Sequence, residues 1–218
     1  MKVPVIRNIL EANDRIAAEN RALFDRHGVF CFNLISSPGA GKTTVLERTI
    51  EALAPKVAIG VIEGDITSNE DARRIAKKGV KAVQINTDGG CHLDGSMIRR
   101  ALDEFDLANL DLLIVENVGN LVCPAEFNVG EHLKVAILSV AEGDDKPLKY
   151  PVIFREASVL LINKIDLLPH VDCSVDKIRK RSLKINPKLN IFEVSARTGE
   201  GIADWAKWLR SKVRRKRK

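Results

Sequence analysis

A glycine-rich segment between an apolar run and a helical pattern has the composition of a phosphate-binding loop. The sequence SSPGAGKTT contains Gly39 and Gly41, which let the backbone wrap with successive amide groups pointing inward at an anion. Lys42 is expected to reach the β- and γ-phosphates, and the Thr43 hydroxyl is expected to bind Mg²⁺. Ser36 stands where the first glycine of the pattern G-x-x-x-x-G-K-[ST] usually lies. An ordinary glycine-rich turn is the alternative, but the order of strand, loop, GKT and helix favours nucleotide binding. The residues expected to contact phosphate are Pro38, Gly39, Ala40, Gly41, Lys42, Thr43 and Thr44.

The segment after a later apolar run has the pattern with which GTPases select guanine. Asn163, Lys164 and Asp166 form N-K-x-D at the end of the run SVLLIN. Asp166 would accept hydrogen bonds from N1–H and the exocyclic amine of guanine, while the Lys164 stem would cover the ring. After the last apolar run, the tripeptide SAR resembles the S-A-K element whose backbone contacts the base in GTPases. GTP and GDP are therefore the expected nucleotides, and the residues expected to bind the base are Asn163, Lys164, Asp166, Ser195, Ala196 and Arg197.

Two acidic residues near the ends of apolar runs are candidates for holding Mg²⁺. Glu116 ends the run LLIVE, and the segment ENVG occupies the place where GTPases carry D-x-x-G. An acid there can hold Mg²⁺ through a water, and the Gly119 N–H can bind the γ-phosphate, which would couple hydrolysis to the position of the loop. Asp65 follows the run VAIGVI and is expected near the same metal, with capping of the next helix as the alternative. The expected catalytic residues are Lys42, Thr43, Asp65, Glu116 and Gly119, of which Thr43, Asp65 and Glu116 would bind Mg²⁺.

Cys91, His92 and Cys123 are candidate ligands for a second kind of metal ion. Two thiolates and an imidazole suit Zn²⁺ or Ni²⁺. The segment GGCHLD is expected to open a helix, and a helix N-terminus would lower the pKa of the Cys91 thiol. Cys123 follows Gly119 by four residues, so it lies on the loop that is expected to respond to the γ-phosphate. The alternative is that these widely separated cysteines are structural.

Short apolar runs alternate with helix-permissive stretches along the chain. The runs suit strands that are buried on both faces, because their apolar residues are consecutive. This alternation predicts an α/β fold with a doubly wound, mostly parallel sheet flanked by helices, in which ligands bind beyond the carboxyl ends of the strands. The expected strands are 29–35, 57–62, 82–85, 112–116, 135–140, 158–163 and 190–195, and the expected helices are 5–25, 43–54, 68–79, 93–105, 175–185 and 201–213. The expected organisation is an N-terminal helical extension (1–28), a P-loop GTPase domain with inserted metal-site segments (29–213) and a basic tail (214–218).

The composition fits one globular domain and argues against several other classes. Of the 218 residues, 45% are hydrophobic and 29% are charged, which is enough apolar material for a sizeable core. The net charge of +6 depends on seven basic residues within 210–218, without which it would be −1, and only 5% of the residues are aromatic, so nucleic-acid binding is not expected. No apolar run approaches the roughly 20 residues that span a bilayer, and the first residues lack the apolar core of a signal peptide, so a cytoplasmic location is expected. The four cysteines form no C-x-x-C pair, and a disulfide framework is not expected.

Taken together, the motifs resemble one known family. The segments SSPGAGKTT, EGDI, TDGGCHLD, ENVGNLVCPAEFNVGE, EGDDKPLKYP and NKIDLLP look like those of the hydrogenase nickel-incorporation GTPases, the HypB family of hydrogenase maturation factors. The similarity runs from about residue 5 to the last helix, so it covers nearly the whole chain. The related urease accessory GTPases typically have Cys-Pro-His at the metal motif, where this chain has Cys91-His92.

The resemblance implies a cytosolic metallochaperone with the P-loop NTPase fold of the SIMIBI type, which binds GTP with Mg²⁺ and hydrolyses it slowly. It implies a homodimer that forms with nucleotide bound, and nickel or zinc held by Cys91, His92 and Cys123 and shared between subunits. It also implies partners, namely other hydrogenase maturation proteins and the precursor of the [NiFe]-hydrogenase large subunit. Neither a glutamine nor an arginine finger can be recognised in the sequence, which agrees with slow hydrolysis.

Several features separate this chain from some members of the family or leave alternatives open. It has no cysteine before Cys31 and only four histidines, so neither an N-terminal cysteine site for nickel nor histidine-rich storage is expected. Lys146 and Lys149 lie in a loop that could reach a nucleotide across a dimer. The alternatives are a urease-accessory-like nickel GTPase and a regulatory GTP switch with an incidental metal site. The second of these predicts partner binding that survives the loss of both metal-site cysteines.

Overall fold

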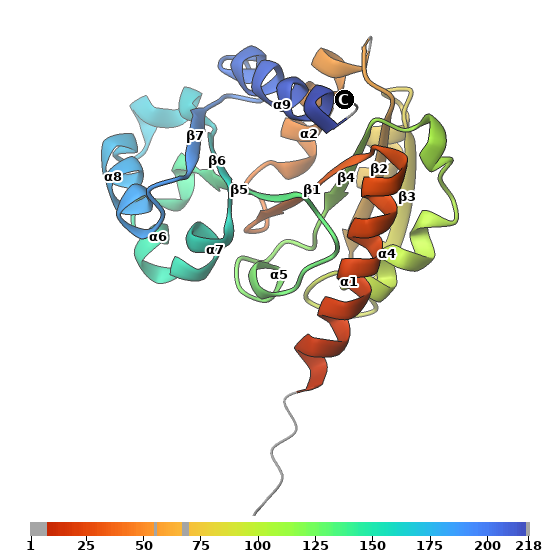
Figure 1. Cartoon of the computed structure of the whole chain (residues 1–218). Coiled ribbons are helices and arrows are strands. Elements are labelled where there is room, and N and C mark those ends of the chain that lie inside the picture. Colours follow the sequence, from red (N-terminus) through yellow and green to blue (C-terminus); the bar gives the residue numbers. More distant parts are fainter. Residues whose placement is uncertain (1–7, 55, 67–69, 217–218) are drawn as a thin grey trace, which may run out of the picture.

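The computed structural model describes residues 8–54, 56–66 and 70–216, which form a seven-stranded sheet with helices on both faces (Figure 1). The strand order is β3-β2-β4-β1-β5-β6-β7, and every pair of neighbours is parallel. This arrangement confirms the predicted doubly wound α/β class. The strands are β1 (Phe30–Ser36), β2 (Ile59–Asp65), β3 (Lys81–Asn86), β4 (Leu112–Glu116), β5 (Leu133–Ser139), β6 (Val159–Asn163) and β7 (Asn190–Glu193).

The connections between parallel strands are helical. The α-helices are α1 (Asn8–His27), α2 (Lys42–Leu53), α3 (Glu70–Ala76), α4 (Gly95–Leu102), α5 (Cys123–Glu126), α6 (Lys146–Lys149), α7 (Pro151–Glu156), α8 (Val175–Ile185) and α9 (Ile202–Lys216). Three 3₁₀ turns complete the described elements, namely η1 (Leu107–Asn109), η2 (Val140–Glu142) and η3 (Ile165–His170).

The consecutive apolar residues of the strands are buried because both faces of the sheet are covered. All residues of β1, β4 and β6 are buried. On one face, Phe32 and Leu34 of β1 pack in a core with residues of α2 and α9. On the other face, Cys31 packs in a core with residues of α1 and α4, and Ile35 packs with α5, α7 and α8. The layers seen in Figure 1 thus follow from the alternation of side chains along each strand.

The predicted elements differ from the structure mainly at their ends. The strand expected over 57–62 is β2, and it continues through the polar residues Glu63, Gly64 and Asp65, which had been expected to follow it. The helix expected over 93–105 begins only at Gly95 and ends at Leu102. The short helices α5, α6 and α7 were not predicted, because each has fewer than two turns and a proline at its first or second position.

Helix α1 packs closely against the rest of the chain. Its Asn20 side-chain amide donates hydrogen bonds to the carbonyl oxygens of Gly95 (2.8 Å) and Val129 (3.2 Å). The predicted helical extension also included residues 1–7, which lie outside the described part of the chain. At the other end, α9 continues to Lys216, so the backbone of 214–216 belongs to a helix rather than to a separate tail, and 217–218 lie outside the described residues. The division into three regions remains a prediction.

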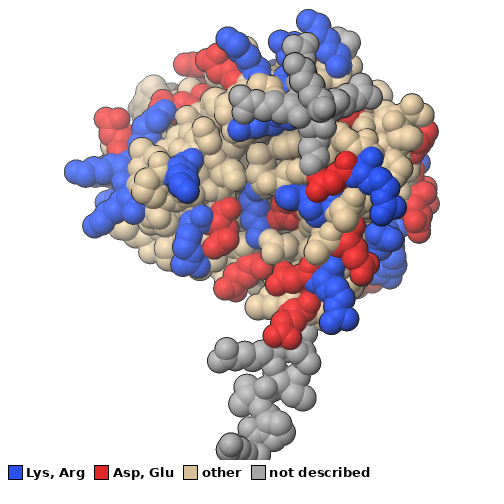
Figure 2. Space-filling view, viewed as in Figure 1, with Lys and Arg blue, Asp and Glu red and all other residues tan. Residues whose placement is uncertain are grey.

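The surface carries both signs of charge. Lys and Arg side chains are interspersed with Asp and Glu side chains on the face shown in Figure 2. Within the described residues, no helix combines the length and the apolar character that crossing a bilayer would require.

Candidate nucleotide and metal sites

The loop between β1 and α2 has the conformation of a phosphate cradle. Gly39 and Gly41 have φ angles of +75° and +95°, in the left-handed region that favours glycine. A Cβ atom at Gly41 would lie only 2.7 Å from Asn163 Nδ2, so this position also needs glycine for space. Lys42 begins α2, and its Nζ donates to the buried Ser36 Oγ at 3.2 Å. Ser36, which departs from the usual glycine, therefore anchors the lysine that is expected to contact phosphate.

A cavity of about 520 Å³ lies over this loop and collects most of the predicted nucleotide residues. It is open to the carboxyl ends of β1, β2 and β4, where ligands of doubly wound sheets bind. Ala40 is buried and does not line it. The predicted residues that line the cavity are Pro38, Gly39, Gly41, Lys42, Thr43, Thr44, Asp65, Glu116, Gly119 and Lys164, and the further lining residues are Ile66, Asp71, Arg74 and Val118.

Two buried carboxyl groups face each other beside the cavity. Glu63 of β2 and Glu116 of β4 are direct partners in the parallel ladder, and both are almost inaccessible to solvent. The Thr43 hydroxyl donates to Glu116 Oε1 at 3.0 Å. Burial, reinforced by the neighbouring Glu116 carboxylate, raises the pKa of Glu63 to about 10. Burial also raises the pKa of Glu116 to about 7, against the effect of the Lys42 charge.

This arrangement fits a divalent cation. Glu63 Oε1 and Glu116 Oε2 are buried and have no hydrogen-bond donor among the other described residues, so the pair needs either a shared proton or a cation. The Thr43 hydroxyl and Asp65 lie in the same cavity, and oxygen ligands are those that Mg²⁺ prefers. The Asp65 carboxylate accepts from the Ile66 N–H at 2.7 Å through Oδ1.

The predicted base-binding segments are joined to the phosphate loop by hydrogen bonds. Asn163 Nδ2 donates to Ala40 O (2.8 Å), and Asn163 Oδ1 accepts from the Ala196 N–H (3.2 Å). Lys164 Nζ donates to Gly39 O at 2.7 Å, which lays its aliphatic stem along the end of the cavity. Asn163 is itself buried, and its side chain joins the phosphate loop to the SAR segment, while its contact with the base remains a prediction.

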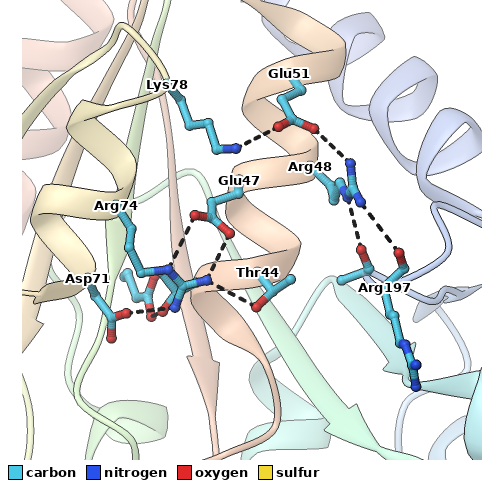
Figure 3. A network of polar contacts seen from close by, with 11 residues as sticks. Thr44, Glu47, Arg48, Glu51, Asp71, Arg74, Lys78 and Arg197 are labelled. Atoms are coloured by element: carbon cyan, nitrogen blue, oxygen red, sulfur yellow. Dashed lines mark hydrogen bonds and ion pairs between the residues drawn. The ribbon is translucent and has the colours of Figure 1, made fainter.

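The acidic residue of the N-K-x-D pattern is also held in place. Ser195 is fully buried, and its Oγ donates to Asp166 Oδ1 at 2.6 Å. Arg48 of α2 donates from Nε to Ala196 O (3.0 Å) and from Nη2 to Arg197 O (3.4 Å), as Figure 3 shows. The Asp166 carboxylate and the backbone of Ala196 and Arg197 are therefore held in place by protein hydrogen bonds.

A network of charged side chains links α2 to α3 at the edge of the cavity (Figure 3). Arg74 donates to Glu47 Oε2 (2.8 Å), Asp71 Oδ1 (3.1 Å) and Thr44 Oγ1 (3.3 Å). Arg74 and Asp71 line the cavity, but no sequence motif pointed to them. The neutralisation of Arg74 by Glu47 and Asp71 makes it a poor donor of extra positive charge to a phosphate.

The structure brings Cys91, His92 and Cys123 together although 32 positions separate the two cysteines. One candidate ligand atom from each residue lies within 4.8 Å of the other two. Cys91 Sγ lies 3.5 Å from His92 Nδ1, and the His92 ring packs against Phe127 with the ring centroids 3.8 Å apart. Burial lowers the pKa of His92, which favours the neutral imidazole that binds metals. Two sulfur atoms and an imidazole at this spacing fit Ni²⁺ or Zn²⁺.

The expected cause of Cys91 acidity is wrong. Helix α4 begins at Gly95 with Asp94 as its N-cap, so Cys91 precedes the cap by three residues and receives no support from a helix N-terminus. A hydrogen bond with Cys123 instead raises the pKa of the Cys91 thiol. The sequence led to the wrong prediction because the helix was expected to begin near Cys91, whereas its N-cap is Asp94, the residue after Cys91-His92-Leu93. A bound cation, rather than a helix dipole, would have to favour the Cys91 thiolate.

Lys146 and Lys149, which were expected on a loop, begin and end α6, and neither lines the cavity in the single chain. Lys149 Nζ pairs with Asp145 at 2.5 Å, and Lys146 Nζ lies 5.3 Å from the centre of the Tyr150 ring. A contact of either lysine with nucleotide across a dimer remains a prediction. Cys31 is fully buried in the core and is not one of the three clustered metal-site residues.

Sequence reasoning missed three further residues near the sites. Glu63 belongs to the motif EGDI, but whether it lies opposite Glu116 depends on the register between β2 and β4. Asn117 and Phe127 belong to the motif ENVGNLVCPAEFNVGE, but their contacts with the loop of Cys91 depend on how two distant segments converge. Membership of the motifs was the only sequence signal for these residues.

Comparison with known proteins agrees with this geometry. The family model described as the CobW/HypB/UreG nucleotide-binding domain matches residues 31–193. The hydrogenase maturation factor HypB of Azotobacter chroococcum mcd 1 is 52% identical over 207 residues, which cover 95% of this chain and 68% of that protein. The crystal structure of HypB from Helicobacter pylori in complex with nickel has a TM-score of 0.88 at 40% identity and covers 94% of this chain and 96% of that chain.

A more distant likeness concerns the fold alone. The signal recognition particle receptor FtsY from Elizabethkingia anophelis has a TM-score of 0.55 at 13% identity, covering 85% of this chain and 67% of that chain. The all-parallel sheet, the family model and the HypB structures, together with the fold of this neighbour, agree with the predicted P-loop NTPase fold of the SIMIBI type. The family model and the high identity over most of the chain confirm the predicted family. The chain therefore belongs to the HypB family of hydrogenase maturation factors, within the CobW/HypB/UreG group of nucleotide-binding domains.

Proposed function

We propose that this chain is a cytoplasmic GTP-hydrolysing metallochaperone that carries nickel, and can hold zinc, for insertion into [NiFe]-hydrogenase during maturation. One observation carries the proposal, which is that a single short segment, 116–123, enters both sites. Glu116 and Gly119 line the nucleotide cavity, and Cys123 belongs to the metal cluster. A phosphate that moves the start of this segment would therefore move a metal ligand at its end.

In the nucleotide site, the contacts of the described residues support the role that we assign to each group. Lys42, anchored at Ser36, binds the β- and γ-phosphates, and the backbone N–H groups of Gly39 to Thr44 surround them, with Pro38 lining the loop. Thr43, Asp65 and Glu116 hold Mg²⁺, which supplies charge neutralisation to the transferring phosphoryl group. Asp166, Lys164 and the SAR backbone select guanine.

We expect hydrolysis to be slow in the isolated protein. The cavity-lining residues that the structure describes include no glutamine, and their arginine, Arg74, is engaged by two carboxylates. Without a glutamine that orients water or a free arginine that adds charge to the transition state, among these described residues, the barrier remains high. Turnover well below the roughly 10 s⁻¹ typical of enzymes is therefore expected in the absence of a partner.

Nickel is cargo at the second site. Cys91 is exposed and Cys123 is half-buried, so an ion held by these residues would remain accessible to a protein that delivers or receives it. The complex of the Helicobacter pylori relative with nickel supports this cargo. We further propose a homodimer that forms with nucleotide bound, and partners among the hydrogenase maturation proteins and the precursor of the hydrogenase large subunit.

Nickel titration in two nucleotide states tests the proposal. Calorimetry would compare the GDP form with the form that holds a non-hydrolysable GTP analogue. If the sites are coupled by a typical 1–3 kcal/mol, the two nickel affinities should differ by roughly 5- to 150-fold. The Cys123→Ala variant should lose tight nickel binding in both states, whereas Cys173→Ala, which changes a half-buried cysteine outside the metal cluster, should match the wild type.

Two results would contradict the proposal. Identical wild-type nickel isotherms in the two nucleotide states would leave a nucleotide site and a metal site without a switch. Equal affinities of the wild type for GTP and ATP would contradict the guanine assignment. Partner binding that depends on nucleotide and survives the loss of both metal-site cysteines would favour a regulatory GTP switch instead.

A further inference from the structure

A buried side-chain amide joins the nucleotide segment to the metal loop. Asn117 directly follows Glu116 and is fully buried. Its Oδ1 accepts hydrogen bonds from the Leu93 N–H (2.9 Å) and the Val118 N–H (3.0 Å). Leu93 directly follows the metal-site residue His92. One oxygen atom therefore fixes the backbone on both sides, at the start of the nucleotide segment and at the end of the Cys91-His92 loop.

The position of this amide is determined by β1. The Asn117 N–H donates to Leu34 O at 3.0 Å, and Asn117 Nδ2 donates to Asn33 Oδ1 at 3.1 Å. Asn33 is also fully buried. Both polar atoms of the Asn117 side chain thus bond to protein groups, and the Leu93 bond lies in a region that is closed to solvent. Loss of such a buried bond costs more than loss of a surface bond.

Leu93 contacts the nucleotide side in a second way. Its side chain is fully buried, and a Cβ atom added at Gly64 would lie 2.6 Å from Leu93 Cδ1. Gly64 lies in β2 between Glu63 and Asp65, at the edge of the expected Mg²⁺ site. The backbone of Leu93 is therefore held by Asn117, and its side chain lies on the strand that carries the acidic residues.

Two of the other connections between the sites are looser. The chain from Gly119 to Cys123 passes through Val122, whose surface is 53% exposed. Asn120 Nδ2 reaches Cys91 O at 3.3 Å, in a solvent-exposed contact that water can replace. Gly119 itself lies against the phosphate loop, since a Cβ there would meet Pro38 at 3.1–3.3 Å. A displacement of Gly119 by a γ-phosphate would thus be passed to the buried residue two positions before it.

We propose that Asn117 is the positioning residue that couples the nucleotide state to nickel affinity, by moving Leu93 and with it the loop of Cys91 and His92. The inference rests on the proposed function and names the route of its regulation. Asn117 contacts neither nucleotide nor metal in this scheme. Its effect is on the ratio of nickel affinities in the two nucleotide states rather than on either binding event alone.

The test compares Asn117→Ala with Asn20→Ala. Asn20 is a matched control because it is also fully buried and its amide donates to Gly95 O and Val129 O, in the segments that follow the metal-site residues. Neither of these two bonds reaches residues 116–119. Nickel is titrated into the GDP and GTP-analogue forms of the wild type and both variants. The wild-type ratio of roughly 5–150 should fall below about 2 in Asn117→Ala and should persist in Asn20→Ala.

The outcomes separate the two levels of the proposal. A wild type without any nucleotide effect on nickel refutes the switch itself, and therefore also its route. A wild-type effect that persists in folded Asn117→Ala refutes only the role of Asn117. A ratio that collapses equally in Asn20→Ala also refutes that role, because general loosening of the metal loops would then be sufficient.

A measurement on the wild type covers the case in which Asn117→Ala does not fold. In metal-free, ¹⁵N-labelled protein, the Leu93 amide should be strongly protected from hydrogen exchange by its bond to Asn117. Replacing GDP by the GTP analogue should shift the Leu93 amide resonance and change its exchange rate. An unchanged Leu93 amide, observed while Gly119 responds to the nucleotide, would overturn the proposal.

Discussion

Replacement of Asp166 by asparagine should change the base that this chain prefers. Asp166 Oδ1 is held by Ser195 Oγ at 2.6 Å, so the carboxylate presents a fixed acceptor edge. Guanine offers two donors to that edge, N1–H and the amine at C2, whereas xanthine has a carbonyl at C2. In Asp166→Asn, one acceptor becomes an NH₂ group that opposes the guanine amine but donates to the xanthine carbonyl.

The size of the effect follows from the number of bonds. One charge-assisted hydrogen bond is lost and the other becomes neutral, which should cost about 2–4 kcal/mol of GTP binding. This corresponds to a roughly 30- to 700-fold weaker GTP affinity. Binding of XTP should strengthen at the same time, because the new donor faces an acceptor.

Competition against a fluorescent GDP analogue measures this change directly. GTP, XTP and ATP would be titrated against the wild type, Asp166→Asn and Asp172→Asn. Asp172 is an exposed acid in the loop before α8, so its substitution makes the same change of charge without touching the base site. An Asp166→Asn protein that still prefers GTP over XTP as strongly as the wild type would refute the assignment of Asp166.

Two further predictions concern stability. Asp94 caps α4 by accepting hydrogen bonds from the Met97 N–H and from Ser96 Oγ, both at 2.8 Å. Asp94→Ala should therefore lower the free energy of unfolding, measured by urea denaturation, by about 1 kcal/mol. Unchanged stability would contradict the capping role. Glu63 has a folded-state pKa raised from 4.5 to about 10, so in metal-free protein its contribution to stability is fully present below pH 4.5 and is lost as pH rises toward 10. The free energy of unfolding of Glu63→Gln should therefore exceed that of the wild type at pH 8, and this advantage should shrink toward pH 5 by up to about 1.4 kcal/mol per pH unit. Stability curves of the two proteins that run parallel over this pH range would contradict the raised pKa of Glu63.

The sequence predicted the architecture well because the buried strands are apolar at consecutive positions. It failed at the end of β2, where Glu63 and Asp65 were read as a loop after the run VAIGVI. Polarity usually marks the end of a buried strand, but here Glu63 is buried within β2, beside its partner Glu116 on β4. The absence of a side chain at Gly64 makes room for Leu93. The functional site therefore begins inside a strand, and a polarity pattern alone cannot show that.

Contiguous motifs allowed most of the candidate site residues to be predicted. The residues after β1 and β6 are positioned by the strand that precedes them. Their position in the sequence, directly after a predicted strand, is therefore enough to place them at the carboxyl edge of the sheet. Asn117 and Phe127 lie within a motif too, but their partners Leu93 and His92 are more than twenty positions away. Such contacts depend on how the loops after β3 and β4 converge, which involves tertiary packing.

The two sites differ in how firmly their residues are held before any ligand binds. In the nucleotide site, Asn163 and Lys164 bind the carbonyls of the phosphate loop, and Ser195 fixes Asp166. In the metal site, Cys91 is exposed, and its carbonyl bond to Asn120 is 3.3 Å long and open to solvent. A preorganised site binds with little rearrangement, whereas a loosely held ligand set changes its geometry at low cost. Although linkage makes the coupling free energy reciprocal, the larger structural response should therefore occur at the metal site, as expected if nucleotide is the input and nickel is the cargo.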